Sequence, residues 1–565
     1  MSEEQGSESA VSRSQFIEEE EAPKKATRRE FVKGATVGAA AAAGAGVLAS
    51  CSSPEGEVGL QGPAGPAGPA GPAGPSGVTE IEWDYETDVV VVGSGQGGLS
   101  AGIRAAQEGA QVVMVEISST TSGGAGFSGA QIHVSGQTDY ETYLDYTEGI
   151  SGPVLGEVYI KTALEYLPWL VDIGTYVTGD PAAFPMLVMG QGEKHPMNCR
   201  TFFDSFVDIF EEEGGTILLN TRALKILTDD TGSILGLRCT GSEGTLDIKA
   251  KAVVLACGGF QNNPELRVRY YGYDADLASI LAVPYNMGDG MKMAQELGAS
   301  LSDSMGTFMA SWGPAFPATN PSEDPEEYEK MPYTPEGKGE LAVVNSFTDV
   351  VCPNPYVYLN VHGKRFIDED ATRYRYAQAT IRERQSKAYL IYDKTANDTT
   401  IGVEDWLWSP RTWEDKVALV EKYGGVVVTA DTLGELADKI NEFKRRGLGI
   451  HKANFLKTMD EYNAAVEAGT TADLEVARTT PVANIETPPF YAIPIAPRIY
   501  LCAGGVRINE NAQVLDMQVQ PIPGLYACPP TAGGVMREIY TGGNCVAGTF
   551  GYIAGPHAAS FVKTS

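Results

Sequence analysis

The segment Asp88-Val89-Val90-Val91-Val92-Gly93-Ser94-Gly95-Gln96-Gly97-Gly98 carries the strongest fold signal in the chain. Its valines predict a buried strand, Leu99 to Glu108 predicts a helix, and Val112 to Glu116 predicts a second strand that ends in an acid. A lone G-x-G-x-x-G motif is weak evidence, but this order of strand, loop, helix and acid is specific for a dinucleotide site. The carboxylate of Glu116 can accept hydrogen bonds from ribose hydroxyls. The glycines let the backbone approach a pyrophosphate at the helix N-terminus, and these predicted contacts are Gly93, Gly95, Gly97 and Gly98.

The totals for the chain narrow the choice of function. A length of 565 residues with 43% hydrophobic content leaves room for two or three domains. The net charge of -31 argues against nucleic-acid binding, because the field of the protein repels phosphate backbones. The eight cysteines form no C-x-x-C or C-x-x-C-H motif, so no c-type haem attachment is predicted, and a cluster built from scattered cysteines is left open. No metal site is predicted, because the histidines show no paired spacing and are expected to be structural: His133, His195, His362, His451 and His557.

The first part of the chain, residues 1–51, reads as an export signal. Thr27-Arg28-Arg29-Glu30-Phe31 precedes an Ala/Gly-rich apolar stretch from Gly34 to Ser50, which resembles a twin-arginine signal and is too short and too small-residue-rich for a membrane span. Leu48-Ala49-Ser50-Cys51 is similar to a lipobox, so Cys51 is the expected lipidation site. A linker over 52–83 follows, in which Gly-Pro-Ala triplets from Gly62 to Gly77 predict a semi-extended spacer. We therefore expect export by the twin-arginine route and a lipid anchor at the extracytoplasmic membrane face or cell surface.

Five further motifs follow the dinucleotide signature. A small-residue segment from Ser122 to Ala130 is suited to lying against a flat ring system; the other four are Val253 to Phe260, Met287 to Gly290, Pro521 to Cys528 and Gly542 to Cys545. In this order the motifs resemble the flavoprotein family of soluble fumarate reductases, urocanate reductases and 3-ketosteroid dehydrogenases. The resemblance extends from Asp84 to Ala559.

The resemblance implies an α/β fold: a doubly wound FAD-binding domain, of the glutathione-reductase-like Rossmann kind, with an inserted α+β substrate-capping domain. The FAD-binding domain would occupy 84–310 and 488–565, and the cap 311–487. One non-covalent FAD is expected. Pro530 stands where the family commonly has a ribose-binding Glu, which puts affinity for the adenosine half in doubt. The family's FAD contacts fall on Gly97, Glu116, Gly124, Ala125, Gly129, Ala130, Ala223, Asp289, Cys545 and Val546.

The segment Leu359 to Arg373 resembles, without a gap, the fumarate reductase segment that ends in a proton-donating arginine. The resemblance therefore makes Arg373 the proton donor, while a surface arginine paired with Glu369 at i,i+4 is the alternative. Asp349 takes the acidic place in the family's proton relay. Cys352 stands at the relay's second arginine, so the proton path is altered or runs through water.

The dicarboxylate-binding residues of the family are replaced in this chain. Tyr500 or Leu501 stands in place of a substrate histidine, and Tyr540 in place of a carboxylate-clamping arginine, so fumarate is a poor candidate. The segment Val535 to Gly542 is similar to the ketosteroid dehydrogenase segment whose tyrosine binds the steroid carbonyl. Tyr540 is therefore expected to polarise a substrate carbonyl, and a core tyrosine satisfied by backbone is the alternative.

These residues together predict an ene-reductase. Hydride from FAD would reach an α,β-unsaturated carbonyl or lactone of a bulky neutral substrate such as a steroid or a cardiac glycoside. The chain has neither a haem motif nor a second nucleotide fingerprint, so a membrane-attached multihaem cytochrome c is the expected electron donor. The alternatives are an oxidative 3-ketosteroid dehydrogenase, a fumarate-reductase-like respiratory reductase of another enoate, and a tethered electron-carrier flavoprotein.

Overall fold

A parallel sheet lies at the centre of the part of the chain that carries the dinucleotide signature. The computed structural model describes residues 81–134, 139–179, 186–190, 199–315, 354–399, 412–479 and 483–565, without the side chains at 373, 445 and 446. Strands β19, β11, β2, β3 and β7 run parallel, and β18 joins the edge antiparallel to β19. The order is β18 (Gln513–Leu515), β19 (Pro521–Ala527), β11 (Ala252–Leu255), β2 (Val89–Val92), β3 (Val112–Val115) and β7 (Thr216–Leu218).

The three inner strands are apolar throughout, because both faces of this sheet are covered. Every residue of β2, β3 and β11 is buried. Val89 lies opposite Val112 on one side and Ala252 on the other. The predicted strand–loop–helix–strand unit is therefore present, with the helix beginning at Gln96, earlier than the expected Leu99.

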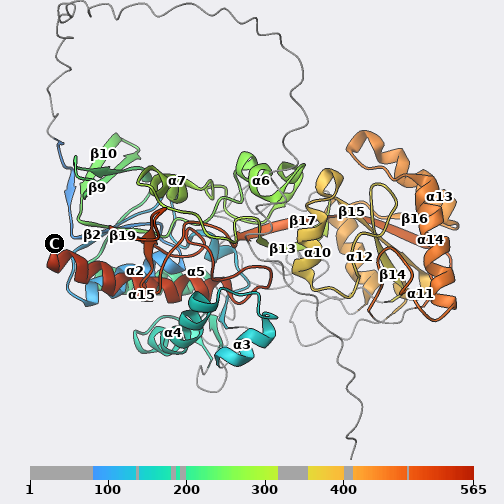
Figure 1. Cartoon of the computed structure of the whole chain (residues 1–565), viewed down its shortest axis with the longest axis horizontal. Coiled ribbons are helices and arrows are strands. Elements are labelled where there is room, and N and C mark those ends of the chain that lie inside the picture. Colours follow the sequence, from blue (N-terminus) through green and yellow to red (C-terminus); the bar gives the residue numbers. More distant parts are fainter. Residues whose placement is uncertain are drawn as a thin grey trace, which may run out of the picture. The chain divides into compact units, whose positions relative to one another are not determined.

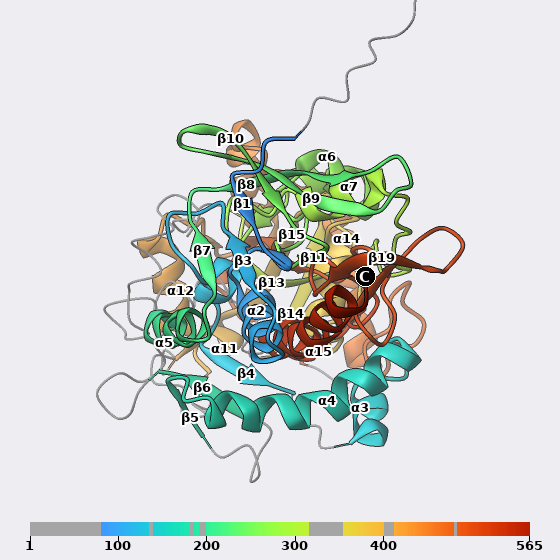
Figure 2. The same cartoon turned by 90° about the vertical axis from the view of Figure 1, so that its left-hand side faces the viewer.

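Helices pack beside this sheet. Figure 2 shows α2 (Gln96–Gln107) and α15 (Gly543–Thr564) next to each other. Glycines allow the close approach: a Cβ on Gly551 would lie 2.1 Å from the Gly97 carbonyl oxygen, and one on Gly555 2.4 Å from that of Ala101. Helix α4 (Pro153–Asp172) also contacts α15, and α5 (Cys199–Glu212) contacts α2. Helix α15 begins directly after Gly542, within the motif from Gly542 to Cys545.

A four-stranded sheet has the order β1 (Tyr85–Glu86), β10 (Gly244–Lys249), β9 (Ile234–Gly241) and β8 (Arg222–Thr228). It is antiparallel except for the parallel pair of β1 and β10. A three-stranded sheet of β4 (Gln131–His133), β6 (Met186–Met189) and β5 (Val177–Thr178) lies after the short helix η1 (Gly123–Phe127). Besides α4 and α5, the helices described between β4 and β13 (Phe308–Pro314) are α3 (Tyr140–Tyr146), α6 (Pro264–Tyr271), η2 (Ala275–Leu277) and α7 (Asp289–Glu296).

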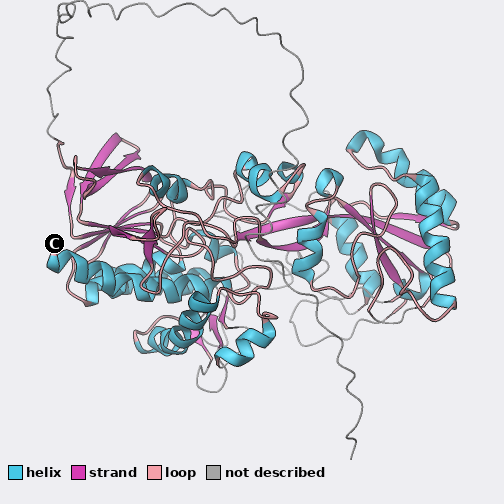
Figure 3. Cartoon of the chain, viewed as in Figure 1, coloured by secondary structure: helices cyan, strands magenta, loops and turns pink. Residues whose placement is uncertain are grey.

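The second large sheet is organised by β17 (Phe490–Cys502), which pairs with four other strands (Figures 1 and 3). The path is β12 (Ser279–Ile280), β17, β15 (Ala388–Asp393) and β14 (Tyr356–Asn360), and β13 (Phe308–Pro314) and β16 (Val428–Ala430) also pair with β17. The accompanying helices are α10 (Arg373–Thr380), η4 (Arg384–Ser386), α11 (Lys394–Asn397), α12 (Trp413–Lys422), α13 (Leu433–Glu442), η5 (Phe443–Arg446) and α14 (Lys452–Glu467).

This part of the chain contains a hydrophobic core of its own, which runs from Val357 on β14 to Ala492 on β17 and includes Phe455 and Tyr462 of α14. The domain boundaries drawn from the sequence at 310 and 487 stay predictions. None of the helices in the described ranges is both long enough and apolar enough to cross a membrane.

Candidate functional site

The glycine loop after β2 is shaped by backbone contacts that exclude side chains. Gly93 has φ of 101°, and a Cβ there would lie 2.6 Å from the Ala256 carbonyl oxygen. A Cβ on Gly98 would lie 1.8 Å from the Gly93 carbonyl oxygen. Helix α2 begins after Gly95, which has no side chain with which to cap the helix. The free N–H groups of the first turn are the anion-binding groups that the motif predicts.

Glu116 lies directly after β3 and faces this loop. Its side chain is buried, its Oε2 accepts hydrogen bonds from Ser94 N at 2.9 Å and Ser94 Oγ at 2.7 Å, and its Oε1 accepts from Ser118 N at 2.9 Å. Burial raises the pKa of the Glu116 carboxyl, and the hydrogen bonds from Ser118 and Ser94 act in the opposite direction. A carboxylate has about four acceptor positions, so Oε1 retains capacity for a hydroxyl donor.

The small-residue segment leaves open space beside its backbone. A Cβ placed on Gly129 would meet no atom within 4 Å, and one on Gly124 would meet only Asn286 Nδ2 at 4.0 Å. Ala125 and Ala130 are buried, and Ala130 has φ of 55°. At Gly124 and Gly129 the segment therefore exposes backbone with no side chain over it.

Asp289 and Ala223 come from different elements, α7 and β8. Arg222, which sequence reasoning missed, connects them: its Nε and Nη2 donate to Asp289 Oδ2 at 3.0 and 2.8 Å.

Cys545 and Val546 lie in the first turn of α15 and are fully buried. Burial raises the pKa of the Cys545 thiol to about 12, so the thiol is neutral.

Tyr540 lies among three aromatic rings from distant elements. Its ring centroid is 5.9 Å from that of Tyr374, 6.0 Å from that of Tyr500 and 6.0 Å from that of His133. Tyr374 belongs to α10, Tyr500 to β17 and His133 to β4. The structure thus brings the predicted substrate residues Tyr540 and Tyr500 together and adds Tyr374 and His133, which the sequence analysis did not assign to this site.

This aromatic cluster adjoins the N-terminus of α15. A Cβ on Gly543 would lie 3.2 Å from Leu501 Cδ2 and 3.3 Å from the Tyr540 hydroxyl oxygen. Gly542 has φ of 102° and carries no side chain to cap the helix. Leu501, the other predicted substrate residue, therefore lies beside Tyr540 at an uncapped helix end, whose positive dipole favours negative charge.

Hydrogen bonds from three side chains hold the backbone of the segment 536–541, called here the Tyr540 loop. Tyr146 donates to the Tyr540 carbonyl oxygen at 3.0 Å, Tyr159 to that of Thr541 at 2.7 Å, and Gln378 Nε2 to that of Glu538 at 3.5 Å. Burial raises the pKa of the Tyr159 hydroxyl well above its ordinary value, so it stays a donor.

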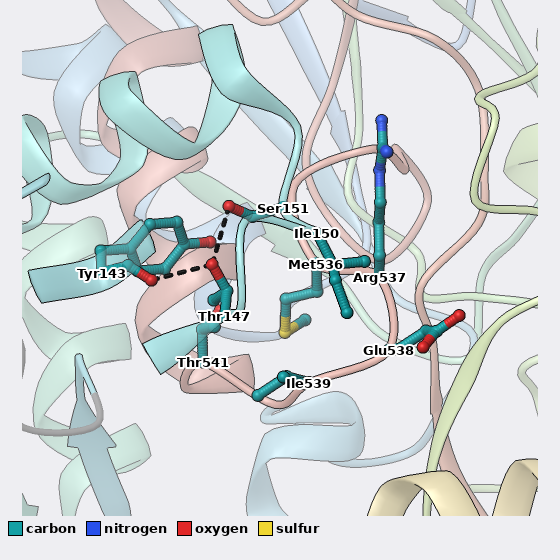
Figure 4. Close-up of a pocket in the computed structure, with 9 residues that line it drawn as sticks. All are labelled: Tyr143, Thr147, Ile150, Ser151, Met536, Arg537, Glu538, Ile539 and Thr541. Atoms are coloured by element: carbon teal, nitrogen blue, oxygen red, sulfur yellow. Dashed lines mark hydrogen bonds between the residues drawn. The ribbon is translucent and has the colours of Figure 1, made fainter. Parts of the chain in front are cut away.

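Behind the Tyr540 loop is a narrow pocket with about 160 Å³ of empty space, none of it wide enough for a water molecule. The hydroxyl of Thr147 donates a hydrogen bond to the Tyr143 carbonyl oxygen at 2.8 Å and lies within hydrogen-bonding distance of Ser151 Oγ, at 3.2 Å (Figure 4). The pocket is too small for a substrate. It is lined by Tyr143, Thr147, Ile150, Ser151, Met536, Arg537, Glu538, Ile539 and Thr541.

Arg373 is the first residue of α10, and Tyr374 next to it reaches the aromatic cluster. Glu369, the alternative surface partner of Arg373, is buried. Its carboxylate is bound instead by Arg365, through Nε at 2.8 Å and through Nη2.

The predicted residues Asp349, Cys352, His195 and Cys51 lie outside the described residues. Within the described ranges, no His, Cys, Asp and Glu side chains gather in threes as metal ligands would.

Comparison with known proteins gives a match over most of the chain. The model of the family described as FAD binding domain matches residues 88–550. A fumarate reductase (cytochrome) from Shewanella frigidimarina is 28% identical over 503 residues, covering 84% of this chain and 77% of that protein. Digoxin reductase from Eggerthella lenta is 25% identical over 558 residues, covering 90% of this chain and 91% of that protein.

Solved structures give the same result for the fold. The open conformation of a flavocytochrome c3 fumarate reductase has a TM-score of 0.58 at 25% identity, over 85% of this chain and 79% of that one. A 3-ketosteroid-Δ4-(5α)-dehydrogenase from Rhodococcus jostii RHA1 has a TM-score of 0.59 at 22% identity, over 85% of this chain and 98% of that one. These likenesses confirm the predicted α/β FAD-binding fold.

Proposed function

This chain belongs to the FAD binding domain family and is an FAD-dependent oxidoreductase, and from that premise we propose that it reduces the activated carbon–carbon double bond of a bulky neutral substrate. The substrate would be an α,β-unsaturated carbonyl compound or lactone with a steroid-like skeleton, such as a cardiac glycoside. The aromatic cluster around Tyr540 carries the proposal. The rings of Tyr374, Tyr500 and His133 lie around the Tyr540 ring, and such an aromatic surface suits a flat apolar ring system better than a dicarboxylate.

The residues present fit FAD. The uncapped first turn of α2 at Gly95 would hold the pyrophosphate, Glu116 a ribose, and the open face at Gly124 and Gly129 the flat ring. When bound there, FAD would supply the hydride for the reduction. The uncapped N-terminus of α15 favours negative charge at its end of the site.

Two side chains of the protein would act on the carbonyl oxygen of the substrate and on the carbon next to the carbonyl. Tyr540 would donate a hydrogen bond to the carbonyl oxygen, which stabilises the negative charge that develops there. Arg373 would deliver the proton to the carbon next to the carbonyl, and its charge would stabilise the enolate. The aromatic rings of Tyr374 and Tyr500 exclude water from the face that they cover.

The test is anaerobic reoxidation of the dithionite-reduced flavoprotein by a panel of 4-androstene-3,17-dione, digoxin, 2-cyclohexenone and fumarate. We expect a neutral enone or lactone to reoxidise the flavin, and fumarate to be slow. Arg373→Ala should abolish reoxidation while dithionite still reduces the bound FAD. Reoxidation by fumarate alone, or oxidation of a saturated 3-ketosteroid as the only activity, would overturn the proposal.

The electron donor that we propose is a membrane-attached multihaem cytochrome c, with the enzyme exported and lipid-anchored at Cys51 for anaerobic respiration. The net charge of -31 favours a basic partner, and one relative is named a fumarate reductase (cytochrome). Stopped-flow mixing of the oxidised enzyme with a reduced low-potential cytochrome c should reduce the flavin rapidly. Rapid reduction by NADH at a physiological concentration would contradict this donor.

A further inference from the structure

Arg375 connects the first turn of α10 to carboxylates that flank the Tyr540 loop. Its backbone N–H donates to the Thr372 carbonyl oxygen at 2.9 Å, so it belongs to the turn that begins at Arg373. Its Nη2 donates to Glu148 Oε2, and its Nε lies 4.0 Å from Glu538 Oε2. Glu148 follows α3, and Glu538 is part of the Tyr540 loop.

Uncharged side chains of α3 and α10 also donate hydrogen bonds to the backbone of the Tyr540 loop. Tyr146, the last residue of α3, donates from its hydroxyl to the Tyr540 carbonyl oxygen at 3.0 Å. Gln378, one turn along α10 from Arg375, is buried and donates to the carbonyl oxygens of Phe308 at 3.1 Å and Glu538 at 3.5 Å. The end of α3, the start of α10 and the Tyr540 loop therefore form one junction with direct contacts between each pair.

Stability does not explain the charged contacts of this junction. The side chains of Arg375, Glu148 and Glu538 are 36%, 48% and 42% exposed, and ion pairs with this exposure contribute little to folding. These contacts can instead affect the reaction rate by fixing the positions of catalytic groups, because a displacement of about 1 Å between reacting groups lowers a rate by up to about 100-fold. We infer that Arg375 and Glu148 are positioning residues that fix the first turn of α10, and with it Arg373, relative to Tyr540.

This inference rests on the proposed function, in which Arg373 and Tyr540 act on the same substrate. A double-mutant cycle tests it with Arg375→Gln, Glu148→Gln and the double variant. The limiting rate and the half-saturating concentration are measured for flavin reoxidation by the panel enone that is fastest with the wild type. Each single change should lower the limiting rate about tenfold, with FAD content and Tm unchanged, and the double change should cost no more than one single change.

Arg384→Gln is the matched control. Arg384 of η4 also forms an ion pair with another segment, with its Nη1 3.4 Å from Asp274 Oδ2, and this partner is not part of the Tyr540 loop. This change should leave the limiting rate unaltered. Arg375→Lys should recover part of the rate, because it retains the charge without the forked geometry.

Ionic strength gives a readout that a purely structural role would not produce. Salt screens an exposed pair, so the limiting rate of the wild type should fall between 0.05 and 0.5 M salt, and that of Arg375→Gln should not. Additive losses in the double variant, or unchanged rates in both single variants, would overturn the positioning role. A wild-type flavin that no panel enone reoxidises would instead overturn the proposed function, and the inference with it.

Discussion

The hydroxyl of Tyr540 is the group that we propose to hold the substrate carbonyl oxygen. Tyr540→Phe retains the ring contacts with Tyr374, Tyr500 and His133 and removes only the donor. We expect the reoxidation rate with an enone to fall about 10²- to 10³-fold, because one donor to a developing oxyanion is worth about that much. FAD content and Tm should be unchanged. A fall of less than about threefold would show Tyr540 to be a core tyrosine, and Tyr143→Phe, on the far side of the Tyr540 loop, is the control.

Residues of this site differ in how far the sequence revealed them. The glycine loop and Glu116 lie within one short segment, so their spacing alone predicted their arrangement. His133 and Tyr374 were missed because they reach Tyr540 only through packing of β4 and α10 against a loop from the other end of the described chain. The roles of Tyr500, Leu501 and Tyr540 came from family resemblance, and the structure adds that the three side chains lie together.

Between β14 and α10, a buried ion pair holds the segment that leads to Arg373. Glu369 and Arg365 have side chains that are 0% and 5% exposed, and Arg365 Nη1 also donates to the Val476 carbonyl oxygen at 2.5 Å. Glu369→Ala would leave the Arg365 charge buried without its carboxylate, so we expect a loss of about 3–5 kcal/mol in the free energy of unfolding, measured by urea titration.

The control for this change is the exposed i,i+4 pair of Arg269 and Glu265 on α6, where the side chains are 59% and 80% exposed. Glu265→Ala should cost less than about 1 kcal/mol. An equal cost for the two changes would contradict the role of burial. This segment also shows a limit of pattern reasoning: the spacing of Glu369 and Arg373 allowed a surface pair as an alternative, whereas the carboxylate is bound by Arg365, four residues before it instead of four after.

Among the secondary-structure elements, local signals predicted the strand β2, the helix α2 and the strand β3. Strand β17 was not predicted, because its sequence contains Pro494 and Pro497, and prolines normally argue against a strand with several partners. Its pairing is decided by β13, β15 and β16, which come from other parts of the chain. Such pairing depends on tertiary contacts that no local pattern contains.

The FAD site that we propose would be assembled from both ends of the described chain. Strands β2 and β3 come from its start, and β19 and α15 from its end. Bound FAD should therefore stabilise all of these elements together, by about 2.7 kcal/mol at a free concentration 100 times Kd. We expect Tm to rise with added FAD and not with the same concentration of NAD. A Tm that does not respond to FAD after removal of the cofactor would contradict this assembly.

The glycine contacts between α2 and α15 have a consequence for how this enzyme can diverge. Because Gly551 and Gly555 bring the backbones of the two helices together, neither helix can slide or tilt without a clash against Gly97 or Ala101. The two helix N-termini therefore keep a constant separation, so a cofactor held by both would keep its position whatever the substrate. Among the described residues, we expect new substrates to be accommodated by changes in β4, in β17, in the first turn of α10 and in the Tyr540 loop. Engineering of this chain for another alkene should begin with libraries at those four places and leave the two helices untouched.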